Sequence, residues 1–144
     1  MKRPLQSPEA KKHFQNACRN IEMAELLAQH GFLEGTAFHA LHAIECLCAA
    51  IVRATGYSRA LPQHKAVLNR AETQLQKWDA RATEELRELL AKIGGSFKMD
   101  REGALHVELP RRDPQLPQNR RANDAGRILT DAKTLYDYVR RLFG

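Results

Sequence analysis

The stretch GTAFHALHAIECLCAAIVRATG, residues 35–56, decides the fold. Its apolar residues recur every three to four positions, a spacing typical of an α-helix, and a glycine ends the pattern. One face of this helix is apolar and carries Ala37, Leu41, Ile44 and Cys48. The opposite face is small and weakly polar and carries Gly35, His39, His42, Cys46, Ala49 and Arg53. Because neither face is strongly charged, we expect both to be covered, the second by another part of the bundle or by a second subunit.

Four further segments show helical spacing around this central helix, which we place at about residues 33–55. The first begins after Ser7, a good N-cap that is followed by Pro8, and ends at Gly31, a natural C-cap. Asp79 is the expected cap of another. The remaining three helices are predicted at about residues 63–77, 80–93 and 120–143.

Two short segments separate the last two helices. Residues 96–109, SFKMDREGALHVEL, alternate polar and apolar positions on both sides of a glycine-containing turn, which predicts a small β-hairpin. Residues 110–119, PRRDPQLPQN, form a connector rich in Pro and Arg that cannot be helical throughout. The sequence therefore predicts an all-α fold, an antiparallel bundle of four to five helices with the hairpin inserted before the last helix. We expect one domain spanning residues 1–144.

The composition is that of a globular chain, with 43% hydrophobic and 28% charged residues, and it excludes a disordered protein. The net charge of +6, with 15 arginines among 23 basic residues, suits partners that carry phosphate. Cys18, Cys46 and Cys48 make an odd number without disulfide-scaffold spacing, so we expect reduced thiols and a cytoplasmic protein. We found neither an apolar leader nor a run of 18 apolar residues, so we expect no membrane association.

The histidines and cysteines of residues 37–48 allow three interpretations. A metal could be held by His39, His42 and Cys46, with Glu45 nearby, but no second ligand pair is visible in the sequence. Cys46 could act as a nucleophile, but nothing marks an oxyanion hole. The third interpretation is a contact surface on which histidines form hydrogen bonds. We expect no metal and no cofactor, and we predict a dimer interface made by His39, His42, Cys46 and Ala49.

Three segments together resemble the HEPN domain: residues 35–56, QHKAV at 63–67, and RRANDAGRILTDAKTLYDYVRRL at 120–142. The resemblance implies a small helical bundle that forms homodimers, with the second and last helices near the contact. It also implies a frequent pairing with a minimal nucleotidyltransferase in modules of the toxin–antitoxin type. The resemblance further implies that catalytic members cleave RNA without a metal. They use an Arg-x(4–6)-His motif near the start of the last helix. In that motif the Arg steadies the phosphate and the His handles the proton of the 2′-hydroxyl.

The sequence departs from this motif, because no histidine follows Arg120 and Arg121. The same spacing occurs from Arg59 to His64 and from Arg101 to His106, but neither pair lies in the last helix, and chance alone predicts about two such matches in this composition. We therefore predict a dimeric module that binds nucleotide, RNA or a nucleotidyltransferase without the usual nuclease pair. The phosphate-binding candidates are Arg111, Arg112, Arg120 and Arg121.

Two alternatives stay open. The first is an active, metal-independent ribonuclease with a displaced histidine, whose catalytic candidates are His39, His42, His64, Arg120 and Arg121. The second is a metal-binding helical bundle.

Overall fold

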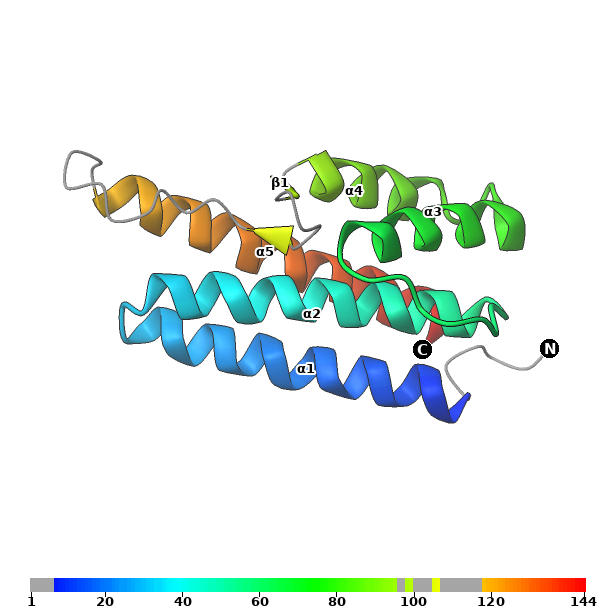
Figure 1. Cartoon of the computed structure of the whole chain (residues 1–144), viewed down its shortest axis with the longest axis horizontal. Coiled ribbons are helices and arrows are strands. Elements are labelled where there is room, and N and C mark those ends of the chain that lie inside the picture. The colour runs from blue at the N-terminus through cyan, green and yellow to red at the C-terminus, as the bar shows by residue number, and fades with distance from the viewer. Residues whose placement is uncertain (1–6, 96–97, 100–104, 107–117) are drawn as a thin grey trace.

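Five α-helices make up the part of the chain that the computed structural model describes, which is residues 7–95, 98–99, 105–106 and 118–144. Figure 1 shows them lying side by side along the long axis of the molecule. The helices are α1 (Pro8–Gln29), α2 (Leu33–Ala54), α3 (Lys65–Asp79), α4 (Glu84–Gly95) and α5 (Gln118–Phe143). The predicted all-α bundle is therefore confirmed.

The centre of the bundle is α2, which packs against α1, α3 and α5. In Figure 1, α1 runs beside α2, and α5 lies behind it. Contacts between α1 and α2 pair Leu27 with Gly35, Asn20 with His39, and Glu9 with Arg53. Residue numbers fall along one helix as they rise along the other, so the two helices are antiparallel.

The core is built from apolar side chains that all five helices contribute. The largest fully buried ones include Ile44, Leu47, Ile51, Leu68, Leu75, Leu90, Ile93, Leu135, Val139 and Phe143. The carboxyl-terminal part of α5 also packs on α1, where Tyr136 stacks on Phe14 with 4.9 Å between ring centroids. Trp78, next to the end of α3, contacts Phe143 with ring centroids 5.2 Å apart.

Among the described residues, one helix, α2, is long and apolar enough to cross a membrane, with a mean hydropathy of 1.5. Two thirds of that apolar window (67%) is buried inside the bundle. The core helix of a soluble protein has the same length and composition, so the feature follows from the central place of α2.

Three helices begin at residues other than the predicted ones. The third helix begins at Lys65 because His64 has a positive φ of 57°, which is incompatible with a helix. The fourth begins at Glu84 because a turn comes first, in which the Ala82 N–H donates to Asp79 Oδ1 at 3.0 Å. The last helix begins at Gln118, so the end of the predicted connector is helical.

The described part of residues 96–109 contains two strands of two residues each, β1 (Lys98–Met99) and β2 (Leu105–His106). They pair antiparallel, with Lys98 opposite His106. This pairing is shorter than the hairpin expected from the sequence, and the rest of that hairpin lies outside the described residues, as does the connector 110–117. The pair adds no layer to the helical bundle.

Candidate functional site

The weakly polar face of α2 is covered by α1 of the same chain. Gly35 lies against Leu27 so closely that a Cβ at this position would be 2.9 Å from Leu27 Cδ1. Further along the same face, Cys46 and Ala49 are only 9% and 7% exposed. The dimer interface expected at His39, His42, Cys46 and Ala49 stays a prediction, and within one chain Cys46 and Ala49 are already largely buried.

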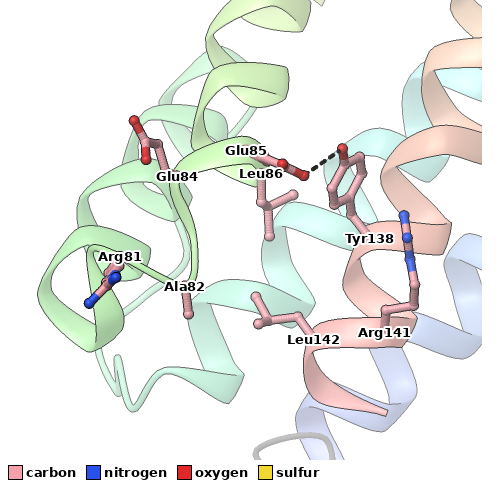
Figure 2. Close-up of a pocket in the computed structure, with 8 residues that line it drawn as sticks. All are labelled: Arg81, Ala82, Glu84, Glu85, Leu86, Tyr138, Arg141 and Leu142. Carbon is pink, nitrogen blue, oxygen red and sulfur yellow. Dashed lines mark hydrogen bonds between the residues drawn. The ribbon is translucent and has the colours of Figure 1, made fainter.

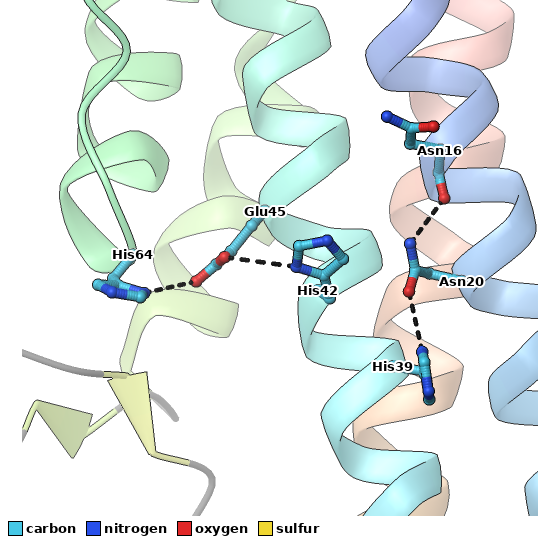
Figure 3. A network of polar contacts seen from close by, with 6 residues as sticks. All are labelled: Asn16, Asn20, His39, His42, Glu45 and His64. Carbon is cyan, nitrogen blue, oxygen red and sulfur yellow. Dashed lines mark hydrogen bonds and ion pairs between the residues drawn. The ribbon is translucent and has the colours of Figure 1, made fainter.

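His39 also belongs to the contact between α1 and α2. Its Nδ1 atom is 2.9 Å from Asn20 Oδ1, and Asn20 Nδ2 donates to the Asn16 carbonyl at 2.8 Å (Figure 3). Since the amide nitrogen of Asn20 is used by Asn16, its oxygen faces the ring, and His39 Nδ1 must be the donor. This arrangement gives His39 a packing role.

A second group of polar side chains lies on the α3 side of α2 and consists of His42, Glu45 and His64. We call these three residues the His–Glu cluster. His64 Nδ1 is 3.1 Å from Glu45 Oε1, and His42 Nδ1 is 3.9 Å from Glu45 Oε2. Figure 3 shows the carboxylate lying between the two rings. The side chains of His42, Glu45 and His64 are 52%, 21% and 38% exposed, so solvent and ligands can reach both imidazoles.

The backbone of His64 is unusual among the described residues. It is the one residue other than glycine in this part of the chain with a positive φ, and its φ and ψ are 57° and −133°. Such a conformation costs about 1–3 kcal/mol for a residue with a side chain. His64 occupies the N-cap position of α3, yet no side-chain hydrogen bond caps this helix. Its ring turns to Glu45 instead, which contributes to holding the strained backbone.

The cluster has the parts of an acid–base site. A carboxylate that accepts a hydrogen bond from Nδ1–H fixes the ring and leaves the lone pair on Nε2. His64 has this arrangement with Glu45. The sequence made His42 and His64 candidates and placed Glu45 near His42. It did not predict that Glu45 also contacts His64, because nothing local relates residues 19 positions apart.

The two cysteines of α2 are buried and unreactive at neutral pH. Burial, with a smaller contribution from the charge of Glu45, raises the pKa of the Cys46 thiol to about 11. The pKa of Cys48 is raised even further, also chiefly by burial. A protonated, buried thiol is a poor nucleophile, so the structure gives no support to catalysis by Cys46.

The metal-binding alternative finds no site in the described ranges. Within residues 7–95, 98–99, 105–106 and 118–144, no group of three His, Cys, Asp or Glu side chains is placed to hold a metal ion. The set predicted from spacing is divided, since His39 contacts Asn20, His42 faces Glu45, and Cys46 is buried.

The family model of the HEPN domain matches residues 10–142, nearly the whole chain. The chain belongs to the HEPN family. No curated protein and no solved structure matched it. The predicted family is thus confirmed, and the family is consistent with a function related to nucleotides or RNA, or with nuclease-like chemistry.

In this HEPN chain, α5 is the helix in which the catalytic motif was expected. It begins at Gln118, so Arg120 and Arg121 fall in its first turn, while Arg111 and Arg112 lie outside the described residues. No histidine occurs between Arg121 and the end of the helix. Figure 1 places the start of α5 at the end of the bundle where α1 turns into α2, whereas Glu45 lies near the middle of α2.

The HEPN bundle also has an open pocket of about 370 Å³ between α4 and the end of α5 (Figure 2). The Arg141 guanidinium lies 4.9 Å from the centre of the Tyr138 ring, and the Tyr138 hydroxyl donates to Glu85 at 3.2 Å. Tyr138 lines this pocket. Two arginines and two glutamates also line it, so no charge dominates: Arg81, Arg141, Glu84 and Glu85.

Proposed function

We propose that this HEPN chain is a module that binds RNA or nucleotide phosphates, and that its last helix does not cleave them. One observation carries the proposal: α5 keeps two arginines in its first turn and has no histidine after them. An arginine can bind a phosphate through two hydrogen bonds, but it cannot accept the proton of a hydroxyl at neutral pH. The helix therefore has the binding half of the nuclease motif without the base.

The surroundings of these arginines favour an anionic ligand. The amino end of a helix carries a partial positive charge, which attracts phosphate groups. Arg111 and Arg112 precede the helix in the sequence, and the whole chain has a net charge of +6. We therefore expect binding that depends on salt and only weakly on base sequence.

Fluorescence anisotropy with a labelled single-stranded RNA tests this proposal. We expect the double variant Arg120→Ala/Arg121→Ala to bind more weakly and to lose about 1 unit of the salt slope for each arginine removed. Arg140→Ala is the matched control, because Arg140 is exposed near the other end of the same helix. Equal binding by the double variant would remove these residues from the site. Absence of RNA and nucleotide binding by the wild type would show the proposal to be wrong.

We also propose that the chain forms a homodimer through a surface that α1 and α2 leave uncovered. Met23, Leu26, Phe32 and Phe38 are 43%, 49%, 62% and 64% exposed, which is unusual for large apolar residues. We call these four residues the apolar patch. Because Asn20 contacts His39, Met23 lies at the level of Phe38 on the neighbouring helix. The Phe38 ring also stacks on the ring of His42, at 6.4 Å between centroids.

On α1, Met23 points away from α5. On α1, Glu25 pairs with Lys133 of α5 at 3.8 Å, and Met23 lies about 200° around the helix from Glu25. A contact through this patch still includes His42, which was predicted to lie in the dimer interface. It does not include Cys46 and Ala49, which are buried. Pairing with a minimal nucleotidyltransferase in a cytoplasmic module of the toxin–antitoxin type belongs to the same proposal and rests on the family alone.

A further inference from the structure

We propose that the pocket between α4 and the end of α5 binds a free α-amino acid with an apolar side chain. The proposed RNA binding does not use this pocket. Tyr138, the first of its α5 residues, lies 17 positions after Arg121, which is roughly 25 Å along a helix. The two proposals are therefore independent, and each can fail without the other.

Tyr138 holds two opposite charges beside the pocket. Its hydroxyl donates to Glu85 Oε2 at 3.2 Å, and the Arg141 guanidinium lies 4.9 Å from the centre of its ring. Arg141 Nε donates to the Asp137 carbonyl at 3.3 Å, and the two terminal guanidinium nitrogens have no hydrogen bond to another described residue. Glu85 and Arg141 form no ion pair with each other. A ligand that carries an ammonium and a carboxylate close together can bridge them.

The side of the pocket next to α3 also carries both signs of charge. Arg81 lies in the turn before α4 and Glu84 begins the helix, and neither has a polar partner among the described residues. The four charged side chains of the pocket are all exposed, two of each sign. The glutamates would repel a phosphate, and the arginines would repel a simple amine. The pocket therefore favours a zwitterion, the form that a free amino acid has at neutral pH.

The middle of the pocket is apolar. Figure 2 shows Leu86 and Leu142 pointing toward each other between the charged side chains, and Ala82 also lines the pocket. An apolar ligand group placed there would be removed from water, which stabilises the complex. The volume of about 370 Å³ is near the lower end of the range for small-molecule sites. An amino acid of the size of leucine has both the charges and the side chain that these features require.

An NMR titration of the isotope-labelled full chain with L-leucine tests the proposal. We expect the amide signals of Leu86, Tyr138 and Leu142 to shift and to saturate, with a dissociation constant of about 1 mM, because the pocket is open and the ligand is small. Two analogues of leucine are the matched ligand controls. Isoamylamine lacks the carboxylate and isocaproate lacks the ammonium, so each should bind about tenfold more weakly through the loss of one charged contact.

Variants identify the residues that hold the ligand. Arg141→Gln removes the partner of the carboxylate, and Glu85→Gln removes the partner of the ammonium. Each should weaken the binding of L-leucine about tenfold. Both residues are exposed, so the variants should keep the helical circular dichroism of the wild type. Arg140→Gln is the matched control, because Arg140 is exposed next to Arg141 and does not line the pocket.

Three results would overturn the proposal. The first is the absence of saturable shifts with L-leucine at about 10 mM, ten times the expected dissociation constant. The second is binding of isoamylamine or isocaproate as tight as that of L-leucine, which would mean that the pocket does not recognise a zwitterion. The third is unchanged binding by Arg141→Gln or by Glu85→Gln. None of these results bears on RNA binding, which is proposed for the other end of α5.

Discussion

Single residues in α2 show which side of the helix is buried in the bundle and which side is exposed. Ala49 and Cys46 are closed in by α1, while His42, one turn away from Cys46, is half exposed. The difference arises because α1 lies across one side of α2 and α3 reaches only part of the other. A substitution on the covered side should therefore change stability, and one on the open side should change function.

Replacing Ala49 by arginine tests this distinction. We expect Ala49→Arg to destabilise the fold by several kcal/mol, about 3 or more, because a charged side chain would be buried without a partner. Urea denaturation gives the free energy of unfolding. Ala28→Arg on the exposed side of α1 is the control and should stay within about 0.5 kcal/mol of the wild type. Wild-type stability in Ala49→Arg would mean that α1 does not cover this residue in solution.

The buried thiol of Cys46 predicts how stability depends on pH. Its pKa is raised from 9.0 to about 11 in the folded chain, so the folded state favours the protonated form. The resulting stabilisation is fully present below pH 9.0 and is lost as the pH rises toward about 11. We expect the free energy of unfolding to fall over this range. Cys46→Ala should show a shallower fall, and an unchanged slope would contradict the burial of the thiol.

At the scale of elements, Arg53 ties the end of α2 to its surroundings. Its Nε lies 3.0 Å from Glu9 Oε2 on α1, and its Nη1 donates to the carbonyls of Tyr57 and Arg59 at 2.8 and 2.7 Å. The segment it holds leads directly into His64. Arg53 therefore fixes the path by which the chain enters α3 with its strained first residue.

Removing this side chain should loosen that segment. We expect Arg53→Ala to lower the free energy of unfolding by about 1–3 kcal/mol, the usual cost of losing hydrogen bonds to a charged group. Amide hydrogen exchange should also become faster at residues 57–64. Arg59→Ala is a close control, because it removes a side chain and keeps the carbonyl that Arg53 uses. Equal exchange in both variants would show that Arg53 does not hold the segment.

The helices could be predicted from the sequence because their apolar spacing and glycine ends are local. The start of α3 could not, since nothing local in the sequence predicts the positive φ of His64 or its contact with Glu45 on another helix. The sequence also could not predict which element covers the second face of α2. A face of small residues with His39 and His42 fits a helix of the same chain and a second copy equally well, and only the packing of α1 distinguishes them.

At the scale of the whole molecule, the apolar patch is the surface that the fold leaves without a partner. Met23, Leu26, Phe32 and Phe38 are exposed on α1, on α2 and in the turn between them. Two copies meeting there would bury four large apolar side chains from each chain. Burial of one such side chain contributes about 1.5–3 kcal/mol, which makes Phe38 a strong test of the contact.

Light scattering at tens of micromolar should find the wild type dimeric and Phe38→Glu monomeric, because the charge would have to be buried in the contact. Phe38 is already exposed in the single chain, so the variant should keep its helical circular dichroism. Ala66→Glu, exposed on α3, is the control and should stay dimeric. A monomeric wild type, or a dimeric Phe38→Glu, would exclude this surface.

The central position of α2 has a consequence for how the chain folds during translation. The ribosome makes α1 and α2 first, and they can pair at once as a helical hairpin. The side of α2 that packs on α5 stays uncovered until α5, the last of the five described helices, has been translated. Until then the nascent chain presents a helix with the hydropathy of a membrane span. We expect a chain that stops before Gln118 to depend on chaperones or to aggregate, because the helix that should cover its core has not been translated.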